Sequence, residues 1–467
     1  MFDQANLRRV TIAVSTIALV IALAIFADHA NLQQEARARS QQTTAASSQA
    51  NRTDGAVGQP DVISIVSCAS AGCHGKVGRE SEEAWKTSYM VWASRDPHAD
   101  AYRTLWNEQS TEILRRLFLG ELGRQERAFD RAAQQQLIHD RCISCHSTVA
   151  RQDPLQNVLS SDGVNCQSCH GSAQHWLDAH LAKNWEESSP QQKAALGFVE
   201  LKDLNRRTQT CVGCHVGNAD QDMNHDLIAA GHPRLIFDFA LYMERLPKHW
   251  AGRDDPQALW NVGQFETTKS AVQLLKMRAE HWVNRQPNSV WPEFAEYDCL
   301  NCHHEMASEW FQETNESGQS LGGLTWGSWY VPYHVWPSTA NSAELESALN
   351  LLRSEMTRRQ PQPEKIVDLC NQVEACLTPA DLWATIEQMP RWDWDALTHW
   401  YFAARACIRA LEDREQPQDL GELKRLLIML GTHLNLPFNE AAVNFERKSL
   451  EELIIAIQNE IASKAAK

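Results

Sequence analysis

The stretch GVNCQSCHG, residues 163–171, carries the pattern around which much of this chain is organised. Two cysteines separated by two residues and followed by a histidine form the attachment pattern of c-type haem. Two thiols on one turn can each bond a vinyl group on the same haem edge, and the next residue binds the iron as its proximal ligand. The stretch therefore predicts a covalently held haem, bonded by Cys166 and Cys169 and ligated by His170.

The same pattern occurs three more times along the chain. Its residues are Cys142, Cys145 and His146; Cys211, Cys214 and His215; and Cys299, Cys302 and His303. Zinc is the rival, because paired Cys-x-x-Cys segments also bind structural zinc. Zinc knuckles have no systematic need for a histidine after each pair, and only 18 of 467 residues are histidine. Haem is therefore the expected cofactor, and a disulfide within each pair is the remaining alternative.

A less regular fifth site begins nearer the amino terminus, with the sequence CASAGCH at residues 68–74. Four residues separate its cysteines, and Gly72 lets the widened loop fold back so that Cys68 and Cys73 both reach one haem. Alternatively only Cys73 bonds the haem, or the two cysteines form a disulfide. The retained Cys-His ending favours haem, with His74 as its ligand, and brings the expected number of haems to five.

The second axial ligand of each iron decides what the haem can do. A haem with histidine on both faces mainly carries electrons, whereas an open face can bind a small molecule. The long insert between the fourth and fifth motifs contains HDLIAAGHP at residues 225–233 and KHW at residues 248–250. We expect His225, His232 and His249 from this insert to serve as distal ligands of the fourth and fifth haems.

The order of motifs in about half of the chain, best between residues 61 and 240, resembles the cytochrome c554 family of tetrahaem electron carriers. The resemblance is carried by WKTS at residues 85–88, PHADAY at residues 97–102, the nonapeptide at residues 163–171 and a histidine about ten residues later. It implies a mostly helical fold around stacked haems, with His98 and His180 as distal ligands of haems other than those nearest in sequence. It also implies an open axial position at the second motif. The widened first motif, the fifth motif and the carboxy-terminal region depart from the family pattern.

The amino-terminal residues predict export. Residues 10–27 form an uncharged apolar run directly after Arg8 and Arg9. This length lies between a secretory signal core of about 7–15 residues and a spanning helix of about 17–25 residues. We interpret residues 1–30 as a membrane anchor or signal, preferring an uncleaved anchor, and the polar residues 31–60 as a flexible linker. Positive charge before the run keeps the amino end inside, so the rest lies on the periplasmic side of the cytoplasmic membrane.

The remaining chain divides into two expected domains, a pentahaem domain at residues 61–335 and a helical domain at residues 336–467. Apolar spacing typical of helices and several prolines delimit the second domain. Its expected helices cover residues 342–358, 363–376, 379–388, 394–412, 420–434 and 449–464. We expect a mainly α fold with little regular sheet. Cys370 and Cys376 are candidates for a disulfide, and Cys407 is expected in the helical core.

The net charge of -15 argues against nucleic-acid binding. The leading hypothesis is electron transfer through a row of haems, with redox proteins at or outside the cytoplasmic membrane as partners and the amino-terminal segment in the membrane. The alternative is an enzyme that acts on a small nitrogen or sulfur compound at an open haem. In either case the carboxy-terminal helices are a candidate surface for a partner protein.

Overall fold

The computed structural model describes the chain in segments. These are residues 63–77, 84–122, 129–148, 160–297, 299, 302–303, 324–326, 330–331, 342–390, 392, 394–414, 419–434, 436 and 447–465. The expected anchor or signal, the expected linker and the expected domain boundary between residues 335 and 336 lie outside them. Among the described residues, no helix combines the length and apolar character needed to cross a membrane.

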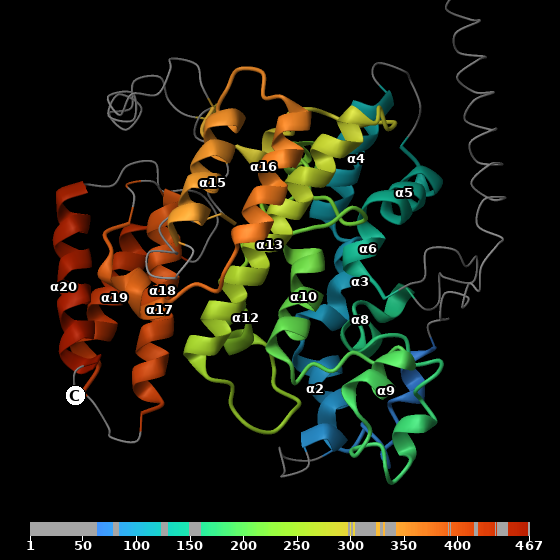
Figure 1. Cartoon of the computed structure of the whole chain (residues 1–467). Helices are drawn as coiled ribbons and strands as arrows, with labels where there is room; N and C mark the ends of the chain where they lie inside the picture. Colours follow the sequence, from blue (N-terminus) through green and yellow to red (C-terminus); the bar gives the residue numbers. More distant parts are fainter. Residues whose placement is uncertain are drawn as a thin grey trace, which may run out of the picture. The chain divides into compact units, whose positions relative to one another are not determined.

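Helices of very different lengths make up the described part of the chain (Figure 1). In the haem region they are α2 (Ser88–Arg95), α3 (Ala101–Thr104), α4 (Glu108–Leu122), α5 (Arg131–Leu137), α6 (Ile143–His146), α8 (Cys166–His170), α9 (Pro190–Ala195), α10 (Leu204–His215), α11 (His225–Ala230), α12 (Phe239–Arg245) and α13 (Pro256–Val283). The later helices are α15 (Ser342–Met356), α16 (Pro363–Cys376), α17 (Leu382–Glu387), α18 (Trp394–Glu412), α19 (Gly421–His433) and α20 (Arg447–Ala465).

The prediction of a mainly α fold is confirmed. Within the described segments only two isolated β-bridges occur, Asn218 with Gln221 and Tyr297 with Trp326. Side-chain caps fix the starts of several helices, because the first backbone N–H groups of a helix have no partner inside it. The side chain of Asp255 accepts from the backbone N–H of Ala258 at 2.9 Å, and Pro256 follows it as the first helical residue of α13.

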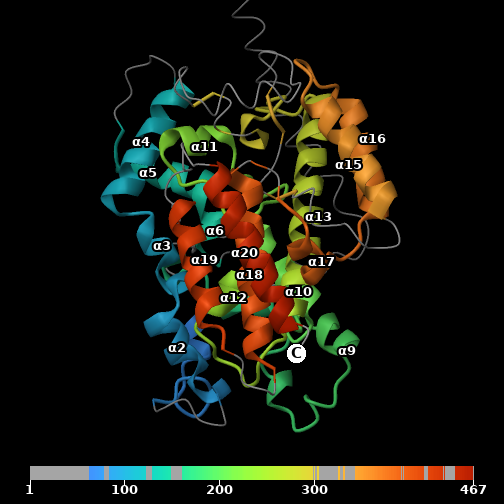
Figure 2. The ribbon, with the colours of Figure 1, turned by 90° about the vertical axis from the view of Figure 1, so that its left-hand side faces the viewer.

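One hydrophobic core joins helices from both expected domains. α13 packs against α10, α16 and α18, and α18 packs against α17, α19 and α20 (Figures 1 and 2). Trp260 of α13 and Trp400 of α18 are fully buried members of this core. The long helix α13 is thus shared between the haem region and the carboxy-terminal helices, while the proposed division at residues 335–336 stays a prediction.

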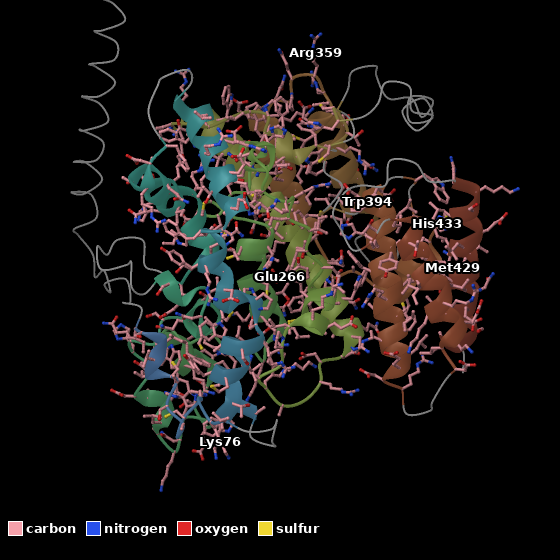
Figure 3. The ribbon with its side chains drawn as sticks, turned by 180° about the vertical axis from the view of Figure 1, so that it is seen from behind. Lys76, Glu266, Arg359, Trp394, Met429 and His433 are labelled. Carbon is pink, nitrogen blue, oxygen red and sulfur yellow. The ribbon has the colours of Figure 1, made fainter. Side chains whose placement is uncertain are left out.

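The cysteines outside the haem motifs correct one expectation. Cys370 and Cys376 are free thiols that both lie on α16. Six residues along a helix span about 9 Å at roughly 1.5 Å per residue, whereas a disulfide needs Cα atoms about 4.4–6.8 Å apart. The suggested disulfide is therefore wrong. Cys407 is fully buried in α18, as expected of a core residue. Of the two histidines of this region, His399 is buried in α18, and His433 is exposed on α19 (Figure 3).

Candidate haem-binding site

A single large cavity unites the first four motifs. Its volume is about 2080 Å³, and both cysteines and the histidine of each of these motifs line it. A usual small-molecule site measures about 300–1,000 Å³. The cavity therefore suits several large groups rather than one. Four histidines from outside the motifs also line the cavity, although they are spread over residues 98–249 of the sequence. They are His98, His180, His232 and His249.

The irregular first motif folds back on itself. The backbone N–H of His74 donates to the carbonyl oxygen of Cys68 at 3.3 Å, which closes the widened loop. Directly after it, Gly75 passes so close to the backbone of Ala69 that any Cβ there would overlap the Ala69 carbonyl oxygen. This tight return places Cys68 and Cys73 together on the cavity wall. The two extra residues therefore do not move either thiol away from the site.

The next three motifs each end a short or medium helix. α6 ends at His146, α8 ends at His170 and α10 ends at His215. The side chain of Asn165 accepts from the backbone N–H of Gln167 at 3.0 Å and so fixes the start of α8. In a helical turn the two cysteines and the histidine stay on neighbouring positions, which is the local geometry that the attachment pattern requires.

Eight histidines form four facing pairs across the cavity. The ring centroids are 6.3 Å apart for His74 and His180, 6.4 Å for His146 and His232, 6.5 Å for His170 and His249, and 6.1 Å for His98 and His215. An imidazole nitrogen lies about 2 Å from a metal and roughly 1.2 Å from its ring centre, so two axial imidazoles on one iron have centres about 6.4 Å apart. Each pair therefore leaves space for one iron. A zinc site needs three or four converging ligands, and the described residues contain no such group.

Hydrogen bonds at Nδ1 orient five of these eight rings. Nδ1 of His74, His146, His180 and His232 donates to the backbone carbonyl oxygens of Trp85, Ala101, Leu177 and Pro233, and Nδ1 of His98 donates to the carboxylate of Asp96. A proton held at Nδ1 leaves Nε2 as the unprotonated nitrogen. Partners of this kind fix the tautomer and the orientation of ligating histidines in metal sites. The five rings are thus prepared to bind through Nε2.

Burial keeps four of the eight site histidines neutral. It lowers the pKa of His170 and of His215 to about 4, and it also lowers the pKa of His146 and His249. The charged form of a group is disfavoured where water is excluded. A histidine ligand must be neutral before it binds a metal. These four rings therefore have a free nitrogen lone pair at neutral pH, as axial ligation requires.

Contacts between cysteines reveal which motifs are neighbours. The thiol of Cys68 hydrogen-bonds with that of Cys166, so the first motif lies beside the third. The thiol of Cys214 hydrogen-bonds with that of Cys145, and Gln221 donates to Cys214 Sγ at 3.0 Å, so the fourth motif lies beside the second. α8 also packs against α10, which joins the third motif to the fourth. The spatial order of the motifs is first, third, fourth, second.

Four of the predicted distal histidines face a motif histidine in the structure, but two of them face other motifs than expected. His98 and His180 face the fourth and first motifs, which are distant from them in sequence, as the family resemblance implied. His232 and His249 face the second and third motifs, not the fourth and fifth. The second motif therefore has an imidazole opposite His146, where an open position was expected. The segments that carry these rings meet across the cavity in an order that differs from their order in sequence.

The fifth motif and His225 lie apart from this arrangement. Cys299, Cys302 and His303 are exposed and do not line the common cavity. His225 is also absent from the cavity wall, although its chain neighbours Asn224, Asp226 and Leu227 line it. Sequence reasoning missed Asp96 and Gln221, both of which contact site residues. Asp96 had a recognisable position, two residues before His98 in an Asp-Pro-His segment.

Comparison with known proteins agrees with the first part of this site. No curated protein and no solved structure matches the chain. Residues 67–171, which contain the first three motifs, match the family model of cytochrome c554 and c-prime. This part of the chain is therefore similar to c-type cytochromes, which bind haem covalently and carry electrons.

Proposed function

We propose that this protein is an exported multihaem cytochrome that relays electrons through five covalently bound haems. The family similarity of residues 67–171 supports haem c as the cofactor, electron transfer as the activity and the periplasm as the location. The number of haems, and the iron ligands assigned to them, are our inference from the motifs and from the histidine geometry.

The facing histidine pairs are the observation that carries this proposal. Four pairs have separations of 6.1–6.5 Å, and each pair combines the histidine of one attachment motif with a histidine from elsewhere in the chain. In each pair the motif histidine would be the proximal ligand and the other the distal ligand. The chain would hold each iron from both sides, which suits electron transfer because no axial position is left for a substrate.

The shared cavity supports a relay rather than four independent centres. Neighbouring motifs contact one another through Cys68 and Cys166, through Cys145 and Cys214, and through the packing of α8 on α10. Groups bound at these motifs would lie close together in the order first, third, fourth, second. The alternative function, catalysis at an open haem, gains no support at the second motif, because His232 faces His146.

The place of the relay in the cell is also part of the proposal. Residues 10–27 would anchor the protein in the cytoplasmic membrane, and the polar residues 31–60 would let the haem region reach redox partners. Those partners would be redox proteins at or outside this membrane. Protease treatment of intact spheroplasts tests the topology, since the haem-containing part should be digested from the outside. Protection of the haem-containing part would contradict export.

Haem quantification tests the cofactor proposal. We expect five haems per polypeptide from a pyridine haemochrome assay. The haem should be covalently attached, so the polypeptide should stain for haem in a denaturing gel. A variant in which Cys68 and Cys73 are both alanine should contain one haem fewer, and the matched variant Cys370→Ala should contain the same number as the unmodified protein. Colourless protein that contains zinc instead would contradict the proposal.

A further inference from the structure

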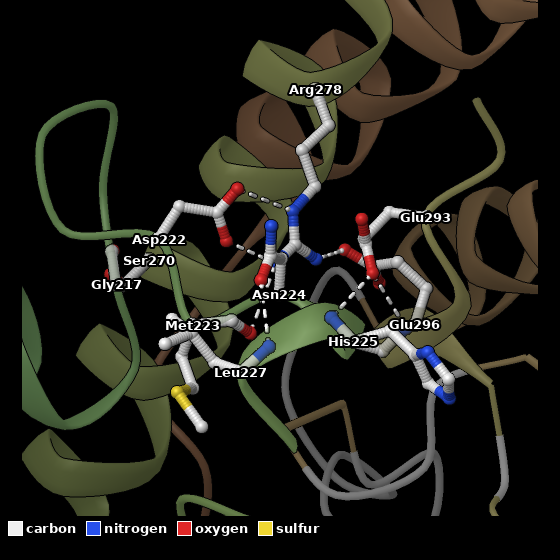
Figure 4. Close-up of polar contacts among 11 residues, drawn as sticks. Gly217, Asp222, Met223, Asn224, His225, Leu227, Ser270, Arg278, Glu293 and Glu296 are labelled. Atoms are coloured by element: carbon white, nitrogen blue, oxygen red, sulfur yellow. Dashed lines mark hydrogen bonds and ion pairs between the residues drawn. The ribbon is translucent and has the colours of Figure 1, made fainter. Parts of the chain in front are cut away.

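Cys299, Cys302 and His303 do not line the common cavity, and the four non-motif histidines of its wall face the other motifs. The segment that leads into the fifth motif, residues 293–297, lies against the start of α11 (Figure 4). The ring of His225, the first residue of α11, packs edge-on against Phe294 with centroids 5.8 Å apart. His225 therefore points toward the segment that carries the fifth motif, and away from the cavity that its neighbours line.

A buried guanidinium holds the two segments together. Arg278 of α13 is only 7% exposed, and its guanidinium donates to Glu296 Oε1 at 2.6 Å on one side. On the other side it forms an ion pair with Asp222, to which its Nε donates at 3.3 Å (Figure 4). We call these three residues the Arg278 network. Asp222 lies three residues before His225, and Glu296 lies three residues before Cys299.

A second carboxylate fixes the backbone of His225 itself. Glu293 is buried, and its Oε1 accepts from the backbone N–H of His225 at 2.8 Å and from that of Ala295 at 3.1 Å. Hydrogen bonds to an ionised carboxylate are stronger than those between neutral groups. The start of α11 and the approach to the fifth motif are therefore connected directly as well as through Arg278.

The approach to the fifth motif is also anchored on its far side. Glu296 Oε2 accepts from Trp326 Nε1 at 3.1 Å, and the buried Tyr297 donates from its hydroxyl to the carbonyl oxygen of Met356 at 3.0 Å. Beyond it, the backbone N–H of His303 donates to the carbonyl oxygen of Cys299 at 2.8 Å, which closes the turn of the motif. The segment is thus held at a defined position relative to α11.

We propose that the Arg278 network is a positioning device that makes His225 the distal ligand of a haem attached through Cys299 and Cys302. This inference rests on the proposed five-haem function. It places the fifth haem outside the common cavity, at the start of α11. Because His232 follows the end of the same short helix and faces His146, α11 connects the fifth haem to the second. The relay then has the order first, third, fourth, second, fifth.

Replacement of the ligand gives the primary test. We expect His225→Ala to keep five haems by pyridine haemochrome assay but to show one high-spin ferric haem in electron paramagnetic resonance (EPR) spectra. The reduced variant should bind one equivalent of carbon monoxide. The matched control is His175→Ala, which replaces an exposed histidine that does not line the cavity, and it should stay fully low-spin. A fully low-spin spectrum of His225→Ala with five haems present would overturn the ligand assignment.

Replacement of Arg278 tests the positioning role. Arg278→Met should give the same high-spin haem and carbon monoxide binding, whereas Arg278→Lys, which keeps the charge, should restore most of the low-spin signal. If Arg278→Met yields no folded protein, Asp222→Asn weakens the same network more mildly and should give a mixture of the two spin states. Unchanged low-spin spectra in the folded variants would overturn the positioning role.

The haem count separates this inference from the function on which it rests. Wild-type protein with four haems, and no loss of haem in Cys302→Ala, would remove the fifth haem and so contradict the proposed five-haem function. Wild-type protein with five haems, one of which Cys302→Ala eliminates, would retain that function. The response of His225→Ala then decides the present inference alone.

Discussion

The carboxylate of Asp96 should control the reduction potential of one haem. Asp96 Oδ1 accepts from Nδ1 of His98 at 2.9 Å and from the backbone N–H of the same residue at 3.0 Å. The side chain is only 7% exposed. Burial is the largest single effect and raises the pKa of Asp96, but the hydrogen bonds with His98 and the charges of His98 and His249 together leave the pKa below its usual value. An ionised carboxylate thus lies behind the imidazole that faces His215, and it should stabilise the ferric state more than the ferrous state.

The substitution Asp96→Asn isolates this charge. An asparagine oxygen at the same position can accept both hydrogen bonds, and asparagine is as good a helix cap as aspartate. Mutation of the hydrogen-bond partner of a metal-binding histidine typically lowers the metal affinity about 10–100-fold. If this factor falls on the ferric state, about 59 mV per tenfold change for a one-electron couple gives a rise of about 60–120 mV for the fourth haem.

A potentiometric titration followed by haem absorption measures the effect. One midpoint should rise in Asp96→Asn, and the others should stay close to their wild-type values. The matched control is Asp100→Asn, because Asp100 is 58% exposed, pairs with Arg103 at 2.7 Å and has the same charge. A titration curve of Asp96→Asn that superimposes on the wild-type curve would refute the reasoning. An equal shift in Asp100→Asn would show that net charge, not the His98 contact, is responsible.

Three further predictions concern the cavity and its surroundings. In His232→Ala, loss of the imidazole that faces His146 should let the reduced protein bind one equivalent of carbon monoxide, measured by absorption titration. In Gly75→Ala, the new methyl group would overlap the Ala69 carbonyl oxygen, and the haemochrome assay should report one haem fewer. Burial raises the pKa of Asp238 to about 6. Since an unfolded aspartate has a pKa of about 3.9, the folded state binds the extra proton, and the free energy of unfolding should fall by up to about 3 kcal/mol as pH rises from about 4 to above 6, measured by urea denaturation.

Each of these predictions has a matched control. His139→Ala replaces an exposed histidine outside the cavity wall and should bind no carbon monoxide. Gly120→Ala adds a methyl group in open space on α4 and should keep all haems. Asp238→Asn should remove its share of the pH dependence, because asparagine does not titrate. Gln264 can rotate its amide and so keep the hydrogen bond between the two side chains. Carbon monoxide binding by wild type, full haem content in Gly75→Ala, or an equally steep pH profile in Asp238→Asn would contradict the corresponding prediction.

Helices with strong apolar spacing were predictable from sequence. α16 and α18 begin and end at the predicted residues, because prolines and polar segments delimit their apolar periodicity. The start of the long helix α13 at Pro256 was not predicted. The Asp255-Pro256 pair is a typical helix start, so this signal was present but was not used.

The attachment residues were predictable from sequence, but the pairing of the facing histidines was not. Two cysteines and a histidine within five residues are brought together by one helical turn, so a local pattern suffices. His74 faces His180, and His98 faces His215, and these pairings depend on how distant segments of the chain pack together. No local periodicity encodes such a pairing, which explains why His232 and His249 were expected at other motifs.

Low-temperature EPR of the fully oxidised protein tests the central claim most directly. The imidazole planes of His74 and His180 are nearly parallel, at 13°, whereas those of the other three facing pairs meet at 72–83°. If these pairs ligate iron, the spectrum contains only low-spin haem, with one ordinary rhombic signal from the first pair and strongly anisotropic signals from the other three. A high-spin ferric signal from any of these four sites, or a spectrum without haem, would contradict the account.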